Sequence, residues 1–208
     1  MTYPDHFFDT LMYPLEAVSL AARRRELIPR ARADVLEIGA GTGANLPHYD
    51  PGRIDSLVLT DTALSDLLEE RAARWRSSAR FTNGAVKLRE ADACSLPFPD
   101  DSFDTVIATL VLCSVSDQRV ALGQIARVLR PGGRLLFIEH VRPPGPVRHL
   151  VDSLNPLWHA VTRECNINRD TAAAIVRAGL RMQMLRRGGG GFLIDGVARA
   201  EPATATPR

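Results

Sequence analysis

The stretch Val35-Leu36-Glu37-Ile38-Gly39-Ala40-Gly41-Thr42-Gly43 decides the fold of this chain of 208 residues. Its apolar start predicts a strand that is buried on both faces, as the strands of a parallel sheet are. Three glycines then follow at alternate positions, and they let the backbone turn sharply and come within contact distance of a ligand. Because open α/β sheets bind small molecules beyond the carboxyl ends of their strands, we predict a ligand site at these glycines.

The elements that follow alternate between strand and helix, which extends this first strand into a sheet. Helix 120–129 is expected to stop at Arg130-Pro131-Gly132-Gly133, and Asn168 or Asp170 to cap the last helix. Four consecutive glycines at 188–191 link two closing strands into a hairpin. We place strands at 35–38, 54–60, 85–89, 105–112, 135–138, 180–185 and 192–198, and helices at 64–76, 120–129, 147–161 and up to residue 178.

This order predicts an α/β, Rossmann-like fold with a mostly parallel seven-stranded sheet, a terminal antiparallel hairpin and helices on both faces. We expect one domain over residues 33–199, an N-terminal helical segment at 1–32 and a disordered tail at 200–208. The N-terminal segment carries an apolar stripe at helical spacing, interrupted near Pro14. It suits a lid over the ligand, a peripheral contact with a membrane, or a helix packed on the core.

Composition bounds the class of protein. The chain is 45% hydrophobic and 24% charged, as in one ordinary soluble domain, and its net charge of +2 with scattered arginines predicts no nucleic-acid partner. No apolar run approaches the roughly 20 residues of a bilayer span, so we expect no transmembrane segment. Cys94, Cys113 and Cys165 are widely spaced without a CxxC pattern, which favours a cytoplasmic protein with neither disulfides nor a metal site. Nothing in the composition predicts an oligomeric state.

Two carboxylates stand where a nucleoside could be held. Asp61 ends the second predicted strand, 22 positions after Gly39, which is close to the spacing of about 20 at which dinucleotide folds place a ribose-binding acid. The same residue could instead cap helix 64–76, and both roles are compatible. Asp92 follows the third strand, where a carboxylate could accept a hydrogen bond from an exocyclic amine.

The glycine loop alone also fits a relaxed dinucleotide pattern, through Gly39, Gly41 and Ala44. The ordered set is more specific, and it closely resembles the class I S-adenosylmethionine-dependent methyltransferases, most of all the group with the ubiquinone and menaquinone C-methyltransferases. The set spans residues 35–140 and comprises Glu37-x-Gly39-x-Gly41-x-Gly43, Asp61, Asp92 before Leu96-Pro97-Phe98, Ser102-Phe103-Asp104, and Leu129-Arg130-Pro131-Gly132-Gly133.

The resemblance implies a class I methyltransferase fold, S-adenosylmethionine as cofactor, and roles for individual residues. Glu37 and the loop with Gly39, Ala40, Gly41 and Gly43 would face the amino-acid moiety of the cofactor. Asp61 would hold the ribose hydroxyls, with Thr62 beside the adenine. Asp92 would accept a hydrogen bond from the adenine amine, and Ala93 would contribute a backbone donor. Leu110 and Val111 would border the methyl donor and the acceptor.

The methyl acceptor is less defined than the cofactor. It should lie over the strand ends, beside the segment after the fifth strand. His140 follows a central strand and titrates near neutrality, so it is the candidate catalytic base, although it could equally hydrogen-bond only loop backbone. The cysteines could also be packed as small apolar residues. The pocket candidates are Val111, Cys113, Glu139, Trp158, Cys165, Asn166, Arg169 and Asp170.

A narrower resemblance bears on the acceptor. Leu110-Val111-Leu112-Cys113-Ser114-Val115, Phe137-Ile138-Glu139-His140-Val141 and the segment 165–171 look like the methyltransferase-like thiol S-methyltransferases of animals and their bacterial relatives. That group implies methylation of small alkyl thiols; its animal members carry a hydrophobic N-terminal anchor, which we do not expect here. A thiol needs no strong base, because its pKa is about 8.5.

We therefore expect a methyltransferase for a small-molecule acceptor, with a thiol first among the candidates. The alternatives are C-methylation of a quinone-type ring, N-methylation of a lipid or metabolite amine, and a non-catalytic cofactor-binding module. Every cofactor position holds a competent residue, which disfavours the module. Asp92 with the loop at 96–98 disfavours an NAD-dependent oxidoreductase.

Overall fold

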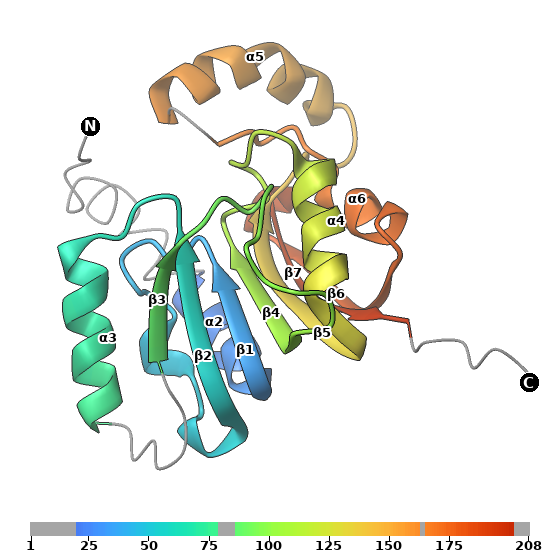
Figure 1. Ribbon diagram of the computed structural model, residues 1–208. Coiled ribbons are helices and arrows are strands. Elements are labelled where there is room, and N and C mark those ends of the chain that lie inside the picture. Colours follow the sequence, from blue (N-terminus) through green and yellow to red (C-terminus); the bar gives the residue numbers. More distant parts are fainter. Residues whose placement is uncertain (1–19, 79–85, 163–164, 202–208) are drawn as a thin grey trace, which may run out of the picture.

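The computed structural model describes residues 20–78, 86–162 and 165–201. These residues form one seven-stranded sheet in the order β3-β2-β1-β4-β5-β7-β6 (Figure 1). The strands are β1 (Ala33–Ile38), β2 (Ile54–Asp61), β3 (Val86–Glu90), β4 (Phe103–Thr109), β5 (Leu129–His140), β6 (Leu180–Gly188) and β7 (Leu193–Ala200). The helices of at least seven residues are α2 (Ala21–Leu27), α3 (Asp66–Ser78), α4 (Gln118–Val128), α5 (Val147–Thr162) and α6 (Thr171–Arg177).

The sheet confirms the predicted fold. Strands β1 to β5 pair in parallel, whereas β7 pairs antiparallel with both β5 and β6. The strand order reverses between β1 and β4, so the carboxyl ends of these two strands flank the crevice in which open α/β sheets bind ligands. The glycine loop leaves β1 at this point.

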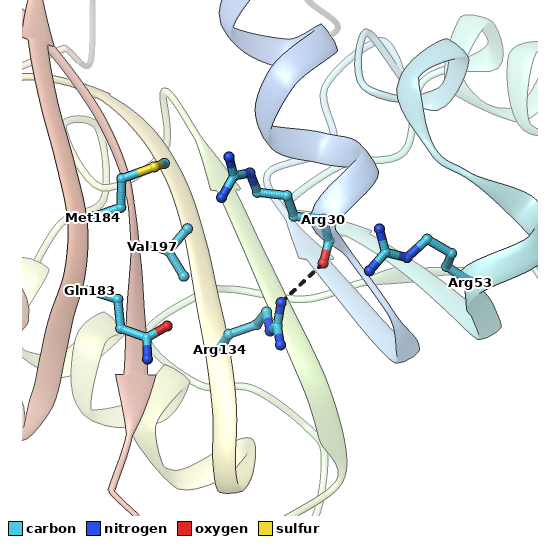
Figure 2. A pocket seen from close by; sticks show the side chains of 6 residues that line it. All are labelled: Arg30, Arg53, Arg134, Gln183, Met184 and Val197. Carbon is cyan, nitrogen blue, oxygen red and sulfur yellow. Dashed lines mark hydrogen bonds between the residues drawn. The ribbon is translucent and has the colours of Figure 1, made fainter.

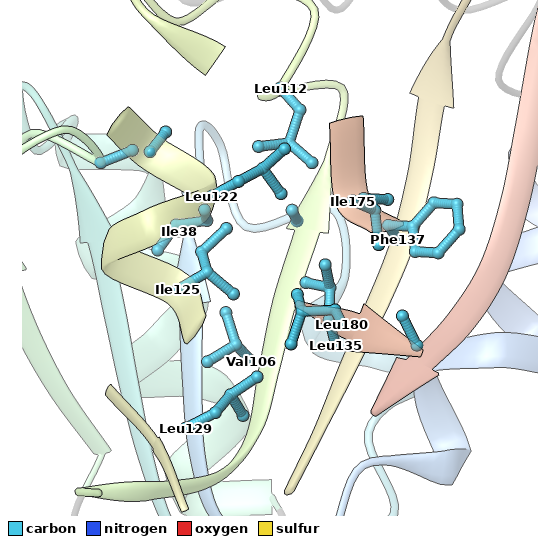
Figure 3. Packing of buried hydrophobic residues seen from close by; sticks show 14 of the residues in the cluster. Ile38, Val106, Leu112, Leu122, Ile125, Leu129, Leu135, Phe137, Ile175 and Leu180 are labelled. Atoms are coloured by element: carbon cyan, nitrogen blue, oxygen red, sulfur yellow. The ribbon is translucent and has the colours of Figure 1, made fainter. Parts of the chain in front are cut away.

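Alternate side chains of the strands build two cores, one on each face of the sheet. On one face Leu122 and Ile125 of α4 pack with Val106 of β4, and Ile175 of α6 lies by Phe137 of β5 (Figure 3). The other face is covered by α2 and α3, with the apolar residues Leu20, Leu27, Ile28, Val35, Leu57, Leu59 and Leu68. The described part of the N-terminal segment thus belongs to the packed core, while residues 1–19, on which the lid prediction rests, lie outside the described residues.

Some element boundaries differ from the prediction for local reasons. Strand β4 ends at Thr109 and not at 112, because Leu110 takes a left-handed conformation with φ of 58°. Strand β5 already begins at Leu129, so the Pro131-Gly132-Gly133 turn lies inside it, at a shift in its register with β4. Asp170, whose carboxylate accepts from the Ala173 N–H, is the cap of α6.

Helix α5 lies beyond the carboxyl ends of the parallel strands, above the site end of the sheet (Figure 1). Four of its apolar side chains are exposed, at helical spacings of three and four residues: Val147, Leu150, Leu154 and Leu157. Pro156 lies inside the helix. No helix within the described ranges is both long and apolar enough to span a bilayer.

Candidate functional site

The glycine loop leaves β1 in a conformation that requires its glycines. Gly39, Gly41 and Gly43 have φ values of 61°, 57° and 79°, which lie in the left-handed region that side chains disfavour. A Cβ added to Gly39 would lie 2.2 Å from Cγ2 of Val111, so the loops after β1 and β4 are in direct contact. A Cβ added to Gly41 would meet no atom of the described residues within 4 Å. The loop therefore leaves open space at Gly41 for a ligand.

Glu37, which precedes the glycine loop in β1, links this loop to its neighbours. Its side chain is only 2% exposed, and its carboxylate accepts hydrogen bonds from Asn45 Nδ2, at 2.9 Å, and from the Tyr49 hydroxyl. Asn45 Nδ2 also donates to Thr109 Oγ1 at 3.1 Å, which ties the loop to the end of β4. Contact of Glu37 with the cofactor stays a prediction, because in the described structure its carboxylate oxygens accept hydrogen bonds from Asn45 and Tyr49.

Burial raises the pKa of Glu37 to about 7, although the hydrogen bonds from Tyr49 and Asn45 oppose this shift. The folded state therefore holds this proton more tightly than the unfolded chain does, and folding stability must fall as the pH rises from about 4.5 to 7. We expect Glu37→Gln to flatten this dependence in urea unfolding of the cofactor-free protein between pH 5 and 8. Glu69→Gln, on the exposed side of α3, is the control and should leave the pH slope unchanged. An unchanged slope in the Glu37 variant would contradict the burial argument.

Asp61 ends β2 beside the glycine loop, and Asp92 follows the end of β3. Asp61 Oδ2 accepts from the Gly41 N–H at 2.8 Å, and its Oδ1 from the Thr62 N–H at 2.7 Å. Asp61 does not cap α3, since Ser65 Oγ accepts from the Leu68 N–H at 3.2 Å and so holds that position. Asp92 is exposed and accepts from the Cys94 N–H at 2.8 Å. A carboxylate has about four acceptor sites, so both acids can accept further hydrogen bonds.

Glu139, at the end of β5, holds the loop that follows β4. Its fully buried carboxylate accepts from the backbone N–H groups of Val111, Leu112 and Cys113 at 2.9 to 3.1 Å. Burial raises the pKa of Glu139 well above its usual range, and these three donors act against that shift. The carboxylate of Glu139 accepts hydrogen bonds from the loop backbone in this structure. Its role in the acceptor pocket therefore stays a prediction.

The segment before α6 closes over the same loop. Arg169 donates from Nη1 to the Leu112 carbonyl and from Nη2 to the Val115 carbonyl, each at 2.7 Å. The Asn166 N–H donates to the Cys113 carbonyl at 2.8 Å. Gln118 Nε2 bonds the Leu112 carbonyl and Thr171 Oγ1, a contact that no motif in the sequence indicated. These hydrogen bonds hold the loop after β4 and the segment before α6 side by side, although the two are distant in sequence.

This closure brings Cys113, His140 and Cys165 together. Their sulfur and nitrogen atoms all lie within 4.8 Å of one another, and Cys165 Sγ is 3.4 Å from His140 Nδ1. Hydrogen bonding to Cys165 and burial raise the pKa of the Cys113 thiol. Burial lowers the pKa of His140, but the hydrogen bond with Cys113 and the nearby acidic groups outweigh it, so the pKa is raised.

The predicted residues thus form two groups at one end of the sheet. The cofactor candidates lie in or after β1, β2 and β3, except for Leu110, which follows β4. The acceptor candidates lie at the ends of β4 and β5 and in the segment before α6. The side chain of Trp158 lies outside the described residues. The sequence did not indicate Asn45, Tyr49 or Gln118, because single polar residues in loops and at a helix start carry no periodic signal that reveals their partners.

A pocket of about 420 Å³ lies elsewhere, near the amino-terminal ends of β1 and β2 (Figure 2). Its lining includes Arg30, Arg53 and Arg134, and Arg134 Nη1 donates to the Arg30 carbonyl at 3.4 Å. Burial and the neighbouring arginines lower the pKa of Arg134. None of the predicted site residues lines this pocket, so it is separate from the site at the carboxyl ends of the strands.

The sheet order, the antiparallel hairpin and the glycine loop define a Rossmann-like class I methyltransferase. A family model described as "Methyltransferase domain" matches residues 36–137. The protein YcgJ of Bacillus subtilis has a similar fold, with a TM-score of 0.66, 20% identity, and coverage of 89% of this chain and 99% of that one.

Proteins of known activity are similar in sequence. The thiol S-methyltransferase TMT1A of Homo sapiens is 33% identical over 171 residues, which are 76% of this chain and 68% of that protein. The ubiquinone/menaquinone biosynthesis C-methyltransferase UbiE of Hahella chejuensis is 38% identical over 120 residues, 57% of this chain and 47% of that protein. The chain belongs to the S-adenosylmethionine-dependent methyltransferase family: it is an enzyme whose cofactor is S-adenosylmethionine.

The residues present fit this cofactor. The loop leaves open space at Gly41, and two carboxylates with spare acceptor capacity follow the neighbouring strands β2 and β3. S-Adenosylmethionine carries hydroxyl and amine donors but no pyrophosphate, so it requires acceptors and close backbone approach more than an anion-binding helix end. The donor and acceptor types at the site match that need.

Proposed function

We propose that this enzyme transfers the methyl group of S-adenosylmethionine to the sulfur of a small thiol. The observation that carries the proposal is the extent of the similarity to thiol S-methyltransferases, which reaches 76% of the chain with TMT1A and 83% with TMT1B of Rattus norvegicus. An alignment of 171 residues is longer than the methyltransferase domain at 36–137, so it must include residues outside that domain. Most of the acceptor candidates, among them Glu139 and Cys165, lie after residue 137 and so outside that domain.

On this proposal the residues around the glycine loop hold the cofactor. The amino-acid moiety of the cofactor contacts the backbone of the glycine loop, at Gly39, Ala40, Gly41 and Gly43. Glu37 precedes this loop and faces the same moiety. Asp61 accepts from the ribose hydroxyls beside Thr62. Asp92 accepts a hydrogen bond from the adenine amine, and the Ala93 N–H donates one to the adenine. When bound, the cofactor supplies a methyl group made electrophilic by a positively charged sulfur.

The loop after β4 would align the acceptor with that methyl group. Val111 contacts the glycine loop, which supports Leu110 and Val111 as the residues that border both the cofactor and the acceptor. An acceptor held against this loop would be oriented and shielded from water, which is the main contribution that methyl transfer requires of the protein. Among the titratable groups at this end of the site, His140 is the base candidate from the sequence and would take the proton of the thiol.

A second candidate is methylation at a carbon or nitrogen atom. Its support is the 38% identity to UbiE and the 33% identity to the phosphatidylethanolamine N-methyltransferase of Cereibacter sphaeroides. Those alignments cover 57% and 61% of the chain, which is less than the thiol S-methyltransferases cover. They support the shared cofactor more than a shared acceptor.

An acceptor panel with methyl-labelled cofactor separates the two candidates. We expect labelled methyl thioethers from small alkyl and aryl thiols, identified by mass spectrometry, and no transfer to the matched alcohols. Quinols and primary amines complete the panel. Label found only on quinols or only on amines would reject the thiol proposal in favour of the second candidate.

A further inference from the structure

Two cysteines and a histidine converge at the acceptor end of the site, although they are far apart in sequence. Cys113 follows β4, His140 is the last residue of β5, and Cys165 precedes α6. Their ligand atoms lie within 4.8 Å of one another; Cys113 is buried, and the other two are half-buried. We propose that these three side chains bind one Zn²⁺ ion and leave its fourth coordination position open toward the acceptor.

The distances suit tetrahedral zinc. Zn–S bonds of about 2.3 Å and Zn–N bonds of about 2.0–2.1 Å place tetrahedral S and N ligands about 3.6 Å apart and two S ligands about 3.8 Å apart. The separation of 3.4 Å between Cys165 Sγ and His140 Nδ1 is already close to that value. The upper limit of 4.8 Å on all three separations leaves about 1 Å for side chains to close around an ion.

The donor set also suits the charge and the chemistry. Two thiolates and a neutral imidazole balance the charge of one Zn²⁺, so the buried site would carry no net charge. Some catalytic zinc sites have two Cys ligands and one His ligand, with the fourth coordination position open. A closed structural site would require a fourth protein ligand.

Hydrogen bonds hold the loop of Cys113 against the segment of Cys165 before any ion binds. The Cys113 N–H donates to Glu139 at 3.1 Å, and the Cys113 carbonyl accepts from the Asn166 N–H at 2.8 Å. Asn166 in turn accepts from Asn155 Nδ2 of α5 at 3.3 Å. A site whose supporting contacts already exist loses little conformational freedom on binding a metal.

The open position gives the zinc a role in the reaction, and this step rests on the proposed function. An acceptor thiol that coordinates zinc loses its proton to solvent and stays bound as a thiolate. A new S–CH₃ bond then forms while the bond from the methyl group to the cofactor sulfur breaks, yielding a methyl thioether and S-adenosylhomocysteine. One proton is released per turnover. His140 acts here as a metal ligand in place of a base.

Metal content tests the site independently of activity. Protein stripped with a chelator and reduced under anaerobic conditions should take up one equivalent of Zn²⁺, measured by mass spectrometry of the dialysed protein. Co²⁺ in its place should give the visible absorption of a tetrahedral thiolate complex. Cys113→Ser, His140→Ala and Cys165→Ser should each lower the affinity at least tenfold. Cys94→Ser is the control and should bind as the parent does, since Cys94 bonds Ser116 and the Asp117 carbonyl instead.

Several outcomes would overturn the site. They are no bound metal in the reduced parent chain, or a loss of metal affinity in the Cys94 variant equal to that in the three ligand variants. The Co²⁺ spectrum of the parent chain decides the matter even if a variant fails to fold. Addition of a thiol should shift that spectrum, whereas its methyl thioether should not; an unchanged spectrum would overturn the thiol-binding role.

The two proposals can fail separately. A metal-loaded enzyme that methylates quinols and no thiol would contradict the proposed function while leaving the zinc site standing. A thiol methyltransferase that binds no zinc and keeps full activity after chelation would overturn the zinc site alone.

Discussion

Replacing Gly39 by alanine should destabilise the enzyme by several kcal/mol. The new methyl group would collide with Val111 at 2.2 Å, in a backbone conformation with φ of 61°. The left-handed conformation costs about 1–2 kcal/mol for a residue with a side chain, and overpacking adds about 1–3 kcal/mol. Urea unfolding of the cofactor-free protein measures the sum.

Gly41→Ala is the matched control, because it keeps the strained φ of 57° but adds its methyl group in open space. We expect it to lose only about 1–2 kcal/mol of stability and yet to bind S-adenosylhomocysteine poorly, since the methyl group occupies space proposed for the ligand. Equal stability of the two variants would contradict the described contact between the loops after β1 and β4. Unchanged ligand binding by the Gly41 variant would contradict the proposed cofactor position.

Asp61→Ala should weaken cofactor binding about ten- to a hundredfold, because a hydrogen bond to a charged acceptor contributes about 1.5–3 kcal/mol. The variant also removes the acceptor of the Gly41 N–H, so the loop loses a support in addition to the proposed ribose contact. Calorimetric titration with S-adenosylhomocysteine measures the change.

Asp66→Ala, an exposed acid at the start of α3, is the control for the loss of one negative charge. It should bind the ligand as the parent does. An unchanged affinity in the Asp61 variant would reduce Asp61 to a support of the glycine loop and remove it from the proposed ribose contact.

The mostly parallel sheet and its terminal antiparallel hairpin were predictable from sequence, because strands and turns follow from patterns that act locally. Continuous apolar runs identify buried parallel strands, and the glycines after Ile38 mark the turn at the switch point. The ends of elements were less predictable. Leu110 continues an apolar run, yet its positive φ ends β4 one residue earlier, and nothing in its side chain announces that conformation.

The contacts within the site depend on which loops meet, and the sequence pattern does not encode this. Cys113, His140 and Cys165 carry no motif spacing, which is why a metal site was not expected from sequence. Only the pairing of β4 with β5 and the hydrogen bonds of Asn166 and Arg169 bring them within reach. The same holds for Glu37, whose partners Asn45 and Tyr49 lie in the loop after the glycines.

The position of the transferred methyl group tests the central claim most directly. We would incubate the enzyme with methyl-labelled S-adenosylmethionine and one acceptor that carries both a thiol and a phenol, such as mercaptophenol, so that both groups enter the same pocket. Nuclear magnetic resonance of the product distinguishes S–CH₃ from O–CH₃ and ring C–CH₃. We predict label on sulfur alone; a methyl group on oxygen or on a ring carbon, with the thiol left free, would contradict the account.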